Sequence, residues 1–519
     1  MASPPGSRKR PALVAAIMGS SVAGLDATVV NVALPAIEQD LGGGLAGQQW
    51  VSNAYLLTLG SLILVGGSLG DLFGERRIFA LGVCGFGVVS LGCALSPSIE
   101  ALIGFRALQG VFGALLTPSA LALIVAVFSG EERGAAIGTW TAWGGIAMVL
   151  GPVVGGYLIG AADWRWIFAI NVPLVLVTLG LILAAVPPRA AGGDPARVDG
   201  VGALLCAVGL AGPVFALIQQ PANGWGSPAV LFPGLGGVAI LALFLAHERR
   251  ASHPMLELSL FSRRNFAVGN AQTFAMYAGL SVLFFFLVLF LQQVAGYEAL
   301  EAGLATLPIT VVMFVLSSRM GRLADRHGPR LFMGAGPLLA AGGLLLMLRL
   351  DAEVDYLADL LPGLLVFSVG LSMTVAPLTG TVLADADEHN AGIASGINNA
   401  VARVAGLLAI AALGAVISAR FGGAIDDRLA GVPLSAQGRA AVAEAKERNL
   451  ALIAADGLPA GERARLAEAS EAASLSAFRL GMGISAALVA LGGLIGAVGI
   501  VNRRREVRAE ECPGGQLTG

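Results

Sequence analysis

Long apolar segments recur along the whole chain and are separated by short polar ones. A helix needs about 20 apolar residues to cross a bilayer. Segments of about this length predict helices over residues 12–36, 48–70, 78–97, 101–127, 134–160, 166–187, 200–219, 228–247, 266–294, 302–320, 331–349, 357–380, 391–419 and 476–501. The strands of a membrane β-barrel would be about ten residues long with alternating polarity. We therefore expect an all-α polytopic membrane protein with fourteen spans.

The composition strengthens this interpretation. The 519 residues are 56% hydrophobic and 13% charged, with a mean hydropathy of +0.79, whereas soluble proteins carry about 25% charged residues. An ordinary soluble enzyme and a disordered chain are thus excluded. The four cysteines lack the spacing of metal ligands, so we expect neither a metal site nor a bound cofactor. No feature points to nucleic acid as a partner.

The distribution of Arg and Lys predicts the orientation, because cytoplasmic loops carry an excess of both. With the N-terminus inside, the predicted inner segments hold the basic clusters, whereas the short outer loops carry only Arg165 and Arg349. We expect a multi-pass protein of the plasma (inner) membrane with both termini in the cytoplasm. Residues 421–474 then lie outside, and their Ala, Leu and mixed charges predict a small helical hairpin or, alternatively, a solvated linker.

Two predicted inner loops share the pattern G-x-L-x-D-x-x-G-x-R. One runs from Gly67 to Arg76 and the other from Gly321 to Arg330. Each follows the second helix of a six-helix set, and duplicated halves are typical of secondary transporters. We therefore predict an N-terminal bundle, an inserted helix pair, a C-terminal bundle and a cytoplasmic tail, over residues 1–190, 191–262, 263–510 and 511–519 respectively.

The duplicated loops also suggest a conformational latch. Their glycines allow a tight turn, and an Asp at a helix end can face a helix N-terminus or an Arg. Such a contact can form in one conformation and break in another. The alternative is a plain loop with membrane-anchoring arginines, which the duplication argues against. The candidate latch residues are Gly67, Asp71, Gly74, Arg76, Gly321, Asp325, Gly328 and Arg330.

Further motifs carry a family resemblance. In chain order they are L-D-A-T-V-V-N-V-A-L-P from Leu25, W-V-S-N-A-Y-L-L from Trp50, R-x-x-Q-G from Arg106, G-P-x-x-G-G from Gly151 and W-R-W-I-F-A-I-N-V-P from Trp164. With the duplicated loop, they resemble the major facilitator superfamily and, more narrowly, its fourteen-spanner drug:proton antiporter family. The resemblance implies two six-helix bundles plus two inserted helices, and export of drugs in exchange for protons. The C-terminal helices lack the extra acidic residues of the family's multi-cation exporters, which argues against dications as substrates.

Only three ionisable side chains fall deep within the predicted spans, namely Asp26, Arg106 and Arg403. Ionisable residues in a bilayer are costly and mark functional sites. Asp26 is the one deep carboxylate, and alternating burial and contact with an Arg could load and release a proton there. The resemblance supports this role for Asp26 and places Arg106 near the coupling site. The alternative is a static Asp26 satisfied by its neighbours.

Polar residues inside the spans are candidates for a substrate cavity, although each alone is more often an interhelical hydrogen bond. They are Asn31, Asn53, Tyr55, Gln109, Asn171, Gln292, Asn398, Asn399 and Arg403. Arg403 could hold an anionic or hydrogen-bond-accepting group, or equally pair with carbonyl groups. A separate helix-packing motif, which allows close approach and a bend, consists of Gly151, Pro152, Gly155 and Gly156.

These features predict a proton-coupled antiporter that exports hydrophobic small molecules by alternating access, with the proton gradient as its energy source. We expect it to act as a monomer in the lipid bilayer. A facilitator or importer of a small nutrient or lipid-like solute on the same fold is the alternative. A membrane-embedded enzyme would need a metal or nucleophile constellation in the spans, and an ATP-driven pump would need a G-x-x-x-x-G-K-[ST] loop. The sequence contains neither.

Overall fold

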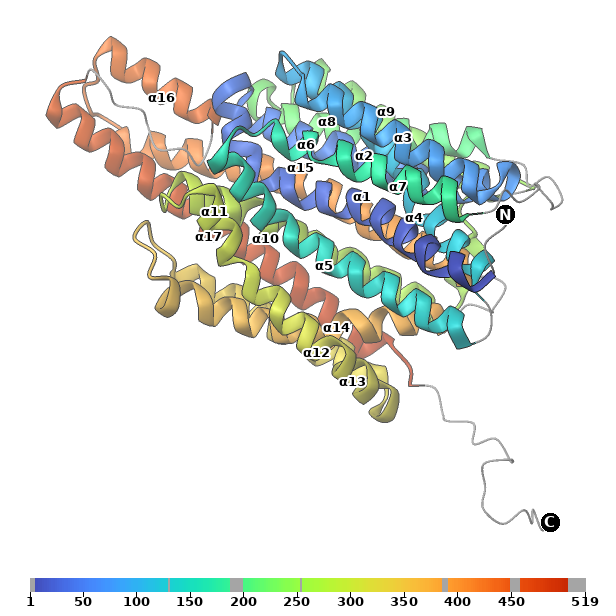
Figure 1. Ribbon diagram of the computed structural model, residues 1–519. Coiled ribbons are helices and arrows are strands. Elements are labelled where there is room, and N and C mark those ends of the chain that lie inside the picture. Colours follow the sequence, from blue (N-terminus) through green and yellow to red (C-terminus); the bar gives the residue numbers. More distant parts are fainter. Residues whose placement is uncertain are drawn as a thin grey trace, which may run out of the picture.

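The computed structural model of the chain describes residues 5–128, 131–186, 199–252, 254–384, 391–448 and 458–502, with some side chains inside these ranges left out. The described part is helical and contains no strand (Figure 1). Twelve of its helices are long and apolar enough to cross a membrane, which confirms an all-α membrane protein. These twelve do not include α2 and α5, which have 30 and 31 residues, so the count of fourteen spans stays a prediction.

The N-terminal bundle and the inserted pair are built from nine helices in the described residues. They are α1 (Pro5–Leu41), α2 (Gly44–Phe73), α3 (Glu75–Ala94), α4 (Ile99–Val127), α5 (Glu131–Ala161), α6 (Trp166–Ala169), α7 (Asn171–Ala185), α8 (Gly200–Asn223) and α9 (Pro228–Glu248). The predicted span 166–187 is interrupted between α6 and α7. Pro173 stands in the first turn of α7, where its missing N–H is tolerated.

The C-terminal bundle follows a short linker. Its elements are a 3₁₀ turn (Leu258–Ser262), α10 (Arg264–Gln293), α11 (Ala299–Ala305), α12 (Leu307–His327), α13 (Pro329–Leu346), a 3₁₀ turn (Met347–Arg349), a π turn (Tyr356–Leu360), α14 (Leu361–Ala384), α15 (Ala391–Leu429), α16 (Ala436–Arg448) and α17 (Ala460–Gly499). The proposed domain boundaries, and the tail 511–519, which lies outside the described residues, stay predictions.

The described part of segment 421–474 is largely helical, and α16 packs against the start of α17 around Ala445 and Leu466, in line with the expected helical hairpin. Its boundaries differ from the expectation, because α15 continues from the membrane to Leu429 and α17 runs from Ala460 into the membrane without a break. The short helix α16 lies beside these two projecting ends (Figure 1). Ala-rich sequence with few β-branched residues lets the spanning helices continue into water.

The two bundles pair their helices in the same way. In the N-terminal bundle α1 contacts α5 and α7, α2 contacts α4, and α3 contacts α4 and α7. In the C-terminal bundle α10 contacts α15 and α17, α12 contacts α14, and α13 contacts α14 and α17. The duplicated loop in the sequence therefore reflects a duplicated bundle.

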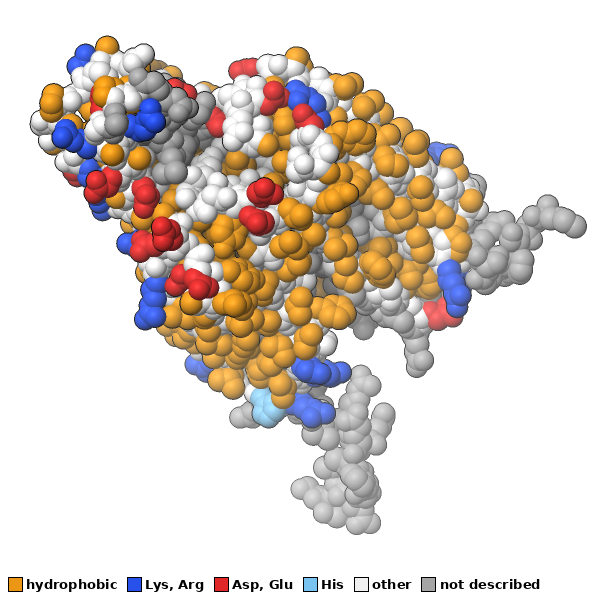
Figure 2. Space-filling model, turned by 60° about the vertical axis from the view of Figure 1, so that its left-hand side comes forward, with side chains coloured by type: hydrophobic (Ala, Val, Ile, Leu, Met, Phe, Trp, Pro, Cys, Tyr) orange, Lys and Arg blue, Asp and Glu red, His pale blue; other side chains and the backbone are white. Residues whose placement is uncertain are grey.

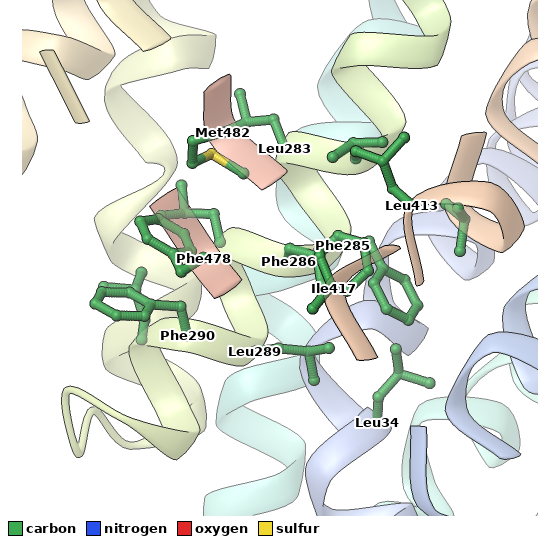
Figure 3. Packing of buried hydrophobic residues seen from close by; sticks show 14 of the residues in the cluster. Leu34, Leu283, Phe285, Phe286, Leu289, Phe290, Leu413, Ile417, Phe478 and Met482 are labelled. Carbon is green, nitrogen blue, oxygen red and sulfur yellow. The ribbon is translucent and has the colours of Figure 1, made fainter. Parts of the chain in front are cut away.

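One end of the molecule has a single hydrophobic core that both bundles share. We call it the closed end; α1 finishes there at Leu41 and α5 at Ala161. Its core places Leu34 of α1 with Phe286 and Leu289 of α10 and with residues of α15 and α17 (Figure 3). At the opposite end the buried residues form separate clusters, one within each bundle. The bundles are thus joined at the closed end and separate toward the other.

The inserted pair α8–α9 covers the line where the bundles meet. Val214 and Ile218 of α8 pack with Leu407 and Ala411 of α15, and α2 residues join the same cluster. On the outer surface, hydrophobic side chains cover the middle of the molecule and charged ones gather toward its ends (Figure 2). This distribution is that of a protein with its middle in hydrocarbon.

Candidate functional site: a buried ion pair and its surroundings

Asp26 of α1 and Arg106 of α4 form an ion pair inside the N-terminal bundle. The exposed fraction is 0% for Asp26 and 1% for Arg106, and an Nη atom of Arg106 donates to Asp26 Oδ2. The Nε atom of Arg106 donates to the backbone oxygen of Val51 at 3.0 Å. Its guanidinium also lies over the ring of Tyr55, 4.4 Å from the centroid. The Arg106 side chain is therefore held from several sides at once.

Two amides complete the shell around Asp26. Gln109 Nε2 and Asn171 Nδ2 donate to Asp26 Oδ1 at 2.9 and 3.2 Å. Both amides also donate to Ser90 Oγ, at 2.9 and 3.3 Å, and Arg106 donates to Gln109 Oε1 at 2.6 Å. All three partners of Asp26 are donors, which is what an ionised carboxylate accepts.

This network gathers side chains from four helices, α1, α3, α4 and α7. Four of its members were candidates from the sequence, whereas Ser90 of α3 was not. A single serine in an apolar helix carries no signal in the sequence, because most such hydroxyls bond to their own helix backbone. Only the packing of α3 against α4 and α7 brings Ser90 to the two amides.

The other candidates in α1 and α2 have different surroundings. Tyr55 donates to the backbone oxygen of Ala23 at 3.1 Å. Asn53 is fully buried, yet neither atom of its amide has a partner in the described residues. Asn31 is half-buried. Buried amides are nearly always hydrogen-bonded, so Asn53 needs water or a ligand.

The candidates in α10 and α15 do not converge on one point. Gln292 donates to the backbone oxygen of Val32 at 3.0 Å and so joins the two bundles near the closed end. Asn398 donates to Thr273 Oγ1 at 2.8 Å within the C-terminal bundle. Asn399 is exposed and donates to the backbone of its own helix, at Ser395.

Arg403 of α15 faces the N-terminal bundle. Its Cβ would lie 3.3 Å from a Cβ placed on Gly60 of α2. Arg403 is half-buried, and among the described residues its guanidinium forms no hydrogen bond or ion pair. A guanidinium at this depth without a carboxylate is costly unless water or a ligand reaches it.

The glycines of the packing motif lie against two different partners. A Cβ on Gly155 would come within 2.5 Å of Val29 in α1, and one on Gly151 would overlap Thr28 of the same helix. A Cβ on Gly156 would instead lie 2.5 Å from the backbone oxygen of Ala299, which belongs to α11 of the other bundle. The motif thus allows close packing both within the N-terminal bundle and between the bundles.

The two candidate latch loops have equivalent conformations. Gly74 and Gly328 have φ of 90° and 89°, values that L side chains rarely adopt. Arg76 donates to the backbone oxygen of Leu183 at 3.3 Å, and Arg330 donates to that of Ala497 at 2.6 Å.

Each of these carbonyl groups lies in the last turn of the final helix of its own bundle, where a cation also interacts favourably with the helix dipole. The side chain of Asp71 lies outside the described part. Asp325 is exposed and has no ion pair in the described residues. The contact of a latch Asp with a neighbouring helix therefore stays a prediction. Gly67 and Gly321 are half-buried, with only a loose contact each to a neighbouring helix.

Two bundles with equivalent helix pairing and a buried ion pair are the architecture of many secondary transporters. Comparison with known proteins agrees, because the model of the Major Facilitator Superfamily matches residues 16–410. The chain belongs to this superfamily, as its motifs predicted, and is a membrane transporter rather than an enzyme.

Two relatives illustrate the relationship. The tetracenomycin C resistance and export protein of Streptomyces glaucescens is 34% identical over 98% of this chain and 94% of its own length. The puromycin resistance protein of Streptomyces alboniger is 37% identical over 79% of this chain and 82% of its own length. Among solved structures, a bacterial homologue of the human lysosomal transporter Spinster has a TM-score of 0.65 at 18% identity, over 95% of this chain and 98% of that one.

Proposed function

We propose that this transporter exports hydrophobic drugs or antibiotics across the plasma membrane in exchange for protons. Resistance and export proteins among its relatives support the direction and the substrate class. The ion pair of Asp26 and Arg106 supports proton coupling, because Asp26 is the one carboxylate deep within the spans. It is the single observation on which the coupling proposal depends.

Protonation of Asp26 would change its whole shell. A neutral carboxyl group attracts the Arg106 guanidinium much less than a carboxylate does, and its O–H must find an acceptor where Gln109 and Asn171 now present donors. The four helices of the network, α1, α3, α4 and α7, would then repack. A proton on Asp26 can in this way favour a different arrangement of the N-terminal bundle, which is the differential contact that coupling requires.

The substrate would bind between the bundles at mid-height. Asn53 and Arg403 present polar groups without described partners there. An apolar site with a few polar groups suits a hydrophobic drug. Arg403 would hold an acceptor oxygen of the substrate. Gln109 and Asn171 contribute indirectly, through Asp26.

We assign the closed end to the outside. The basic loops at Arg76 and Arg330 lie at the opposite end, and cytoplasmic loops are the basic ones. Both termini then lie in the cytoplasm. Separation of the bundles at the closed end, around the contact of Gly156 with α11, would expose the site to the outside. The duplicated loops would close the cytoplasmic end, and a single chain suffices for the cycle.

The coupling proposal is tested by Asp26→Asn in proteoliposomes that have an acidic lumen and carry the cytoplasmic face outward. The unaltered protein should concentrate external tetracenomycin C or puromycin in the lumen, and a trapped dye should record the loss of lumenal protons. Asp26→Asn should abolish concentration and proton loss but preserve exchange of labelled for unlabelled drug without a gradient.

Matched controls separate coupling from folding. Asp427→Asn removes an exposed carboxylate of α15 and should leave proton-driven uptake unchanged. Protein-free liposomes correct for passive uptake of a weak base. Since Asp26→Asn leaves a buried Arg106 without its carboxylate, which costs about 3–5 kcal/mol, the double variant Asp26→Asn/Arg106→Gln is measured beside it. Continued concentration of drug by either variant would contradict the role of Asp26.

A further inference from the structure

A pocket lined by arginines lies between the projecting ends of α15 and α17. Its volume is about 570 Å³, and its lining includes Arg420 and Arg428 of α15, and Arg479 and Leu480 of α17. The lining contains no acidic side chain. The pocket lies at the closed end, on the outer surface of the C-terminal bundle and away from the ion pair of Asp26.

Much of the hydrogen-bonding capacity of these arginines is free. Arg420 uses only its Nε atom, which donates to Ser476 Oγ at 2.8 Å. One terminal nitrogen of Arg479 donates to Leu350 and Asp351 at 3.0 and 2.8 Å. Arg428 has no partner in the described part of the chain. All three guanidinium groups of the lining therefore keep free N–H donors, and Asp351 offsets the charge of Arg479 alone. Guanidinium groups bind phosphate oxygens in pairs of parallel hydrogen bonds.

The pocket lies at the boundary between apolar and charged helix surface. Beyond Arg479, α17 has no charged residue as far as its end at Gly499. On α15, Val416 stands one turn before Arg420 and is 40% exposed, and Leu480 beside Arg479 is 37% exposed. An apolar track thus leads from the arginines toward the middle of the membrane, where acyl chains would lie.

We propose that this pocket binds the phosphate headgroup of an anionic phospholipid, with its acyl chains along Val416 and Leu480. Guanidinium groups at the level of the headgroups suit a phosphodiester both by charge and by geometry. The apolar track argues for a lipid rather than a soluble phosphate, because a soluble anion has no apolar part that could contact it. Interfacial arginines that merely anchor a helix point singly into the headgroup region, whereas these three line one cavity.

Native mass spectrometry of the delipidated full-length protein tests the proposal. The protein is mixed with equal amounts of phosphatidylglycerol and phosphatidylcholine, and the bound lipid is counted. We expect one phosphatidylglycerol to be retained preferentially. Arg428→Gln, which disturbs no described protein contact, should weaken this binding about tenfold, the effect of losing one charge-assisted hydrogen bond. Arg420→Gln/Arg428→Gln should abolish the preference.

Arg465→Gln is the matched control, because Arg465 is exposed on α17 outside the pocket. It should retain the lipid fully. Equal loss in Arg465→Gln would show that general surface charge attracts the lipid and would overturn the proposal. An absence of preference for phosphatidylglycerol in the unaltered protein would also overturn it. So would displacement of the lipid by an equal concentration of inorganic phosphate, which would mark a site for soluble anions.

Discussion

Gly156→Ala should open the closed end of the transporter. Gly156 of α5 packs against α11 of the other bundle, where an added Cβ would lie 2.5 Å from both the backbone oxygen of Ala299 and the Cα of Leu300. Ordinary contact begins at 3.4 Å, so the two backbones must separate by about 0.9 Å, the difference between the two distances. Both clashing atoms belong to the backbone and cannot rotate away.

The cost of this overlap is that of overpacking a well-packed interface, about 1–3 kcal/mol. The overlap exists only while the bundles touch at the closed end, so the added methyl group acts on one side of the conformational equilibrium alone. The ratio of closed to open molecules should therefore fall about 5- to 150-fold. The substitution should not weaken helix α5 itself, since Ala is a better helix former than Gly.

A cysteine at position 34 reports the opening. Leu34 is fully buried in the shared core of the closed end (Figure 3). In a background without the native cysteines, Leu34→Cys should react slowly with a water-soluble maleimide. Adding Gly156→Ala should accelerate labelling by up to about 5- to 150-fold, the change expected in the ratio of closed to open molecules. Gly160→Ala is the control and should not accelerate labelling, because an added Cβ one turn further along α5 meets nothing within 4 Å. Equal labelling rates in all three proteins would refute the argument.

Two further substitutions test other parts of the structure. Arg403→Gln should weaken binding of the anion anilinonaphthalene sulfonate about tenfold, which is the effect of losing one hydrogen bond to a charged group. Binding of the uncharged parent compound, phenylnaphthylamine, should not change. Equal effects on both ligands in fluorescence titrations would contradict a ligand role for Arg403. Gly328→Ala should lower the apparent thermal midpoint, because φ of 89° costs a non-glycine residue about 1–3 kcal/mol and the methyl group would overlap Asn502. Gly342→Ala on α13, with open space around it, is the control and should not lower it.

The spans were predictable because a bilayer leaves few choices. Each crossing must satisfy its backbone internally over about 20 apolar residues, and the apolar runs coincide with the helices of the membrane region. The ends were less predictable. Residues 421–474 contain charges of both signs, and charge alone does not stop an Ala-rich helix, so α15 and α17 extend beyond the expected boundaries.

The candidate site was predictable in part for the same reason. A charge deep in a span is expensive, so Asp26, Arg106 and Arg403 stood out from residue type and depth alone. The sequence did not reveal, however, that Asp26 pairs with Arg106. Asp26 and Arg106 are 80 residues apart in the chain, and no periodicity along one helix specifies which face of α4 turns toward α1.

The sequence by itself determined that this chain is a duplicated helical membrane transporter, because hydropathy, the repeated loop and the motifs are local and depend on the bilayer rather than on packing. Only the tertiary structure decided that Asp26 is surrounded by donors from two other helices, α4 and α7, while the guanidinium of Arg403 has no acceptor among the described residues. It also decided that Gly156 packs across the bundles and Gly155 within one. Neighbouring residues on a helix point 100° apart, so their partners depend on which helices surround them.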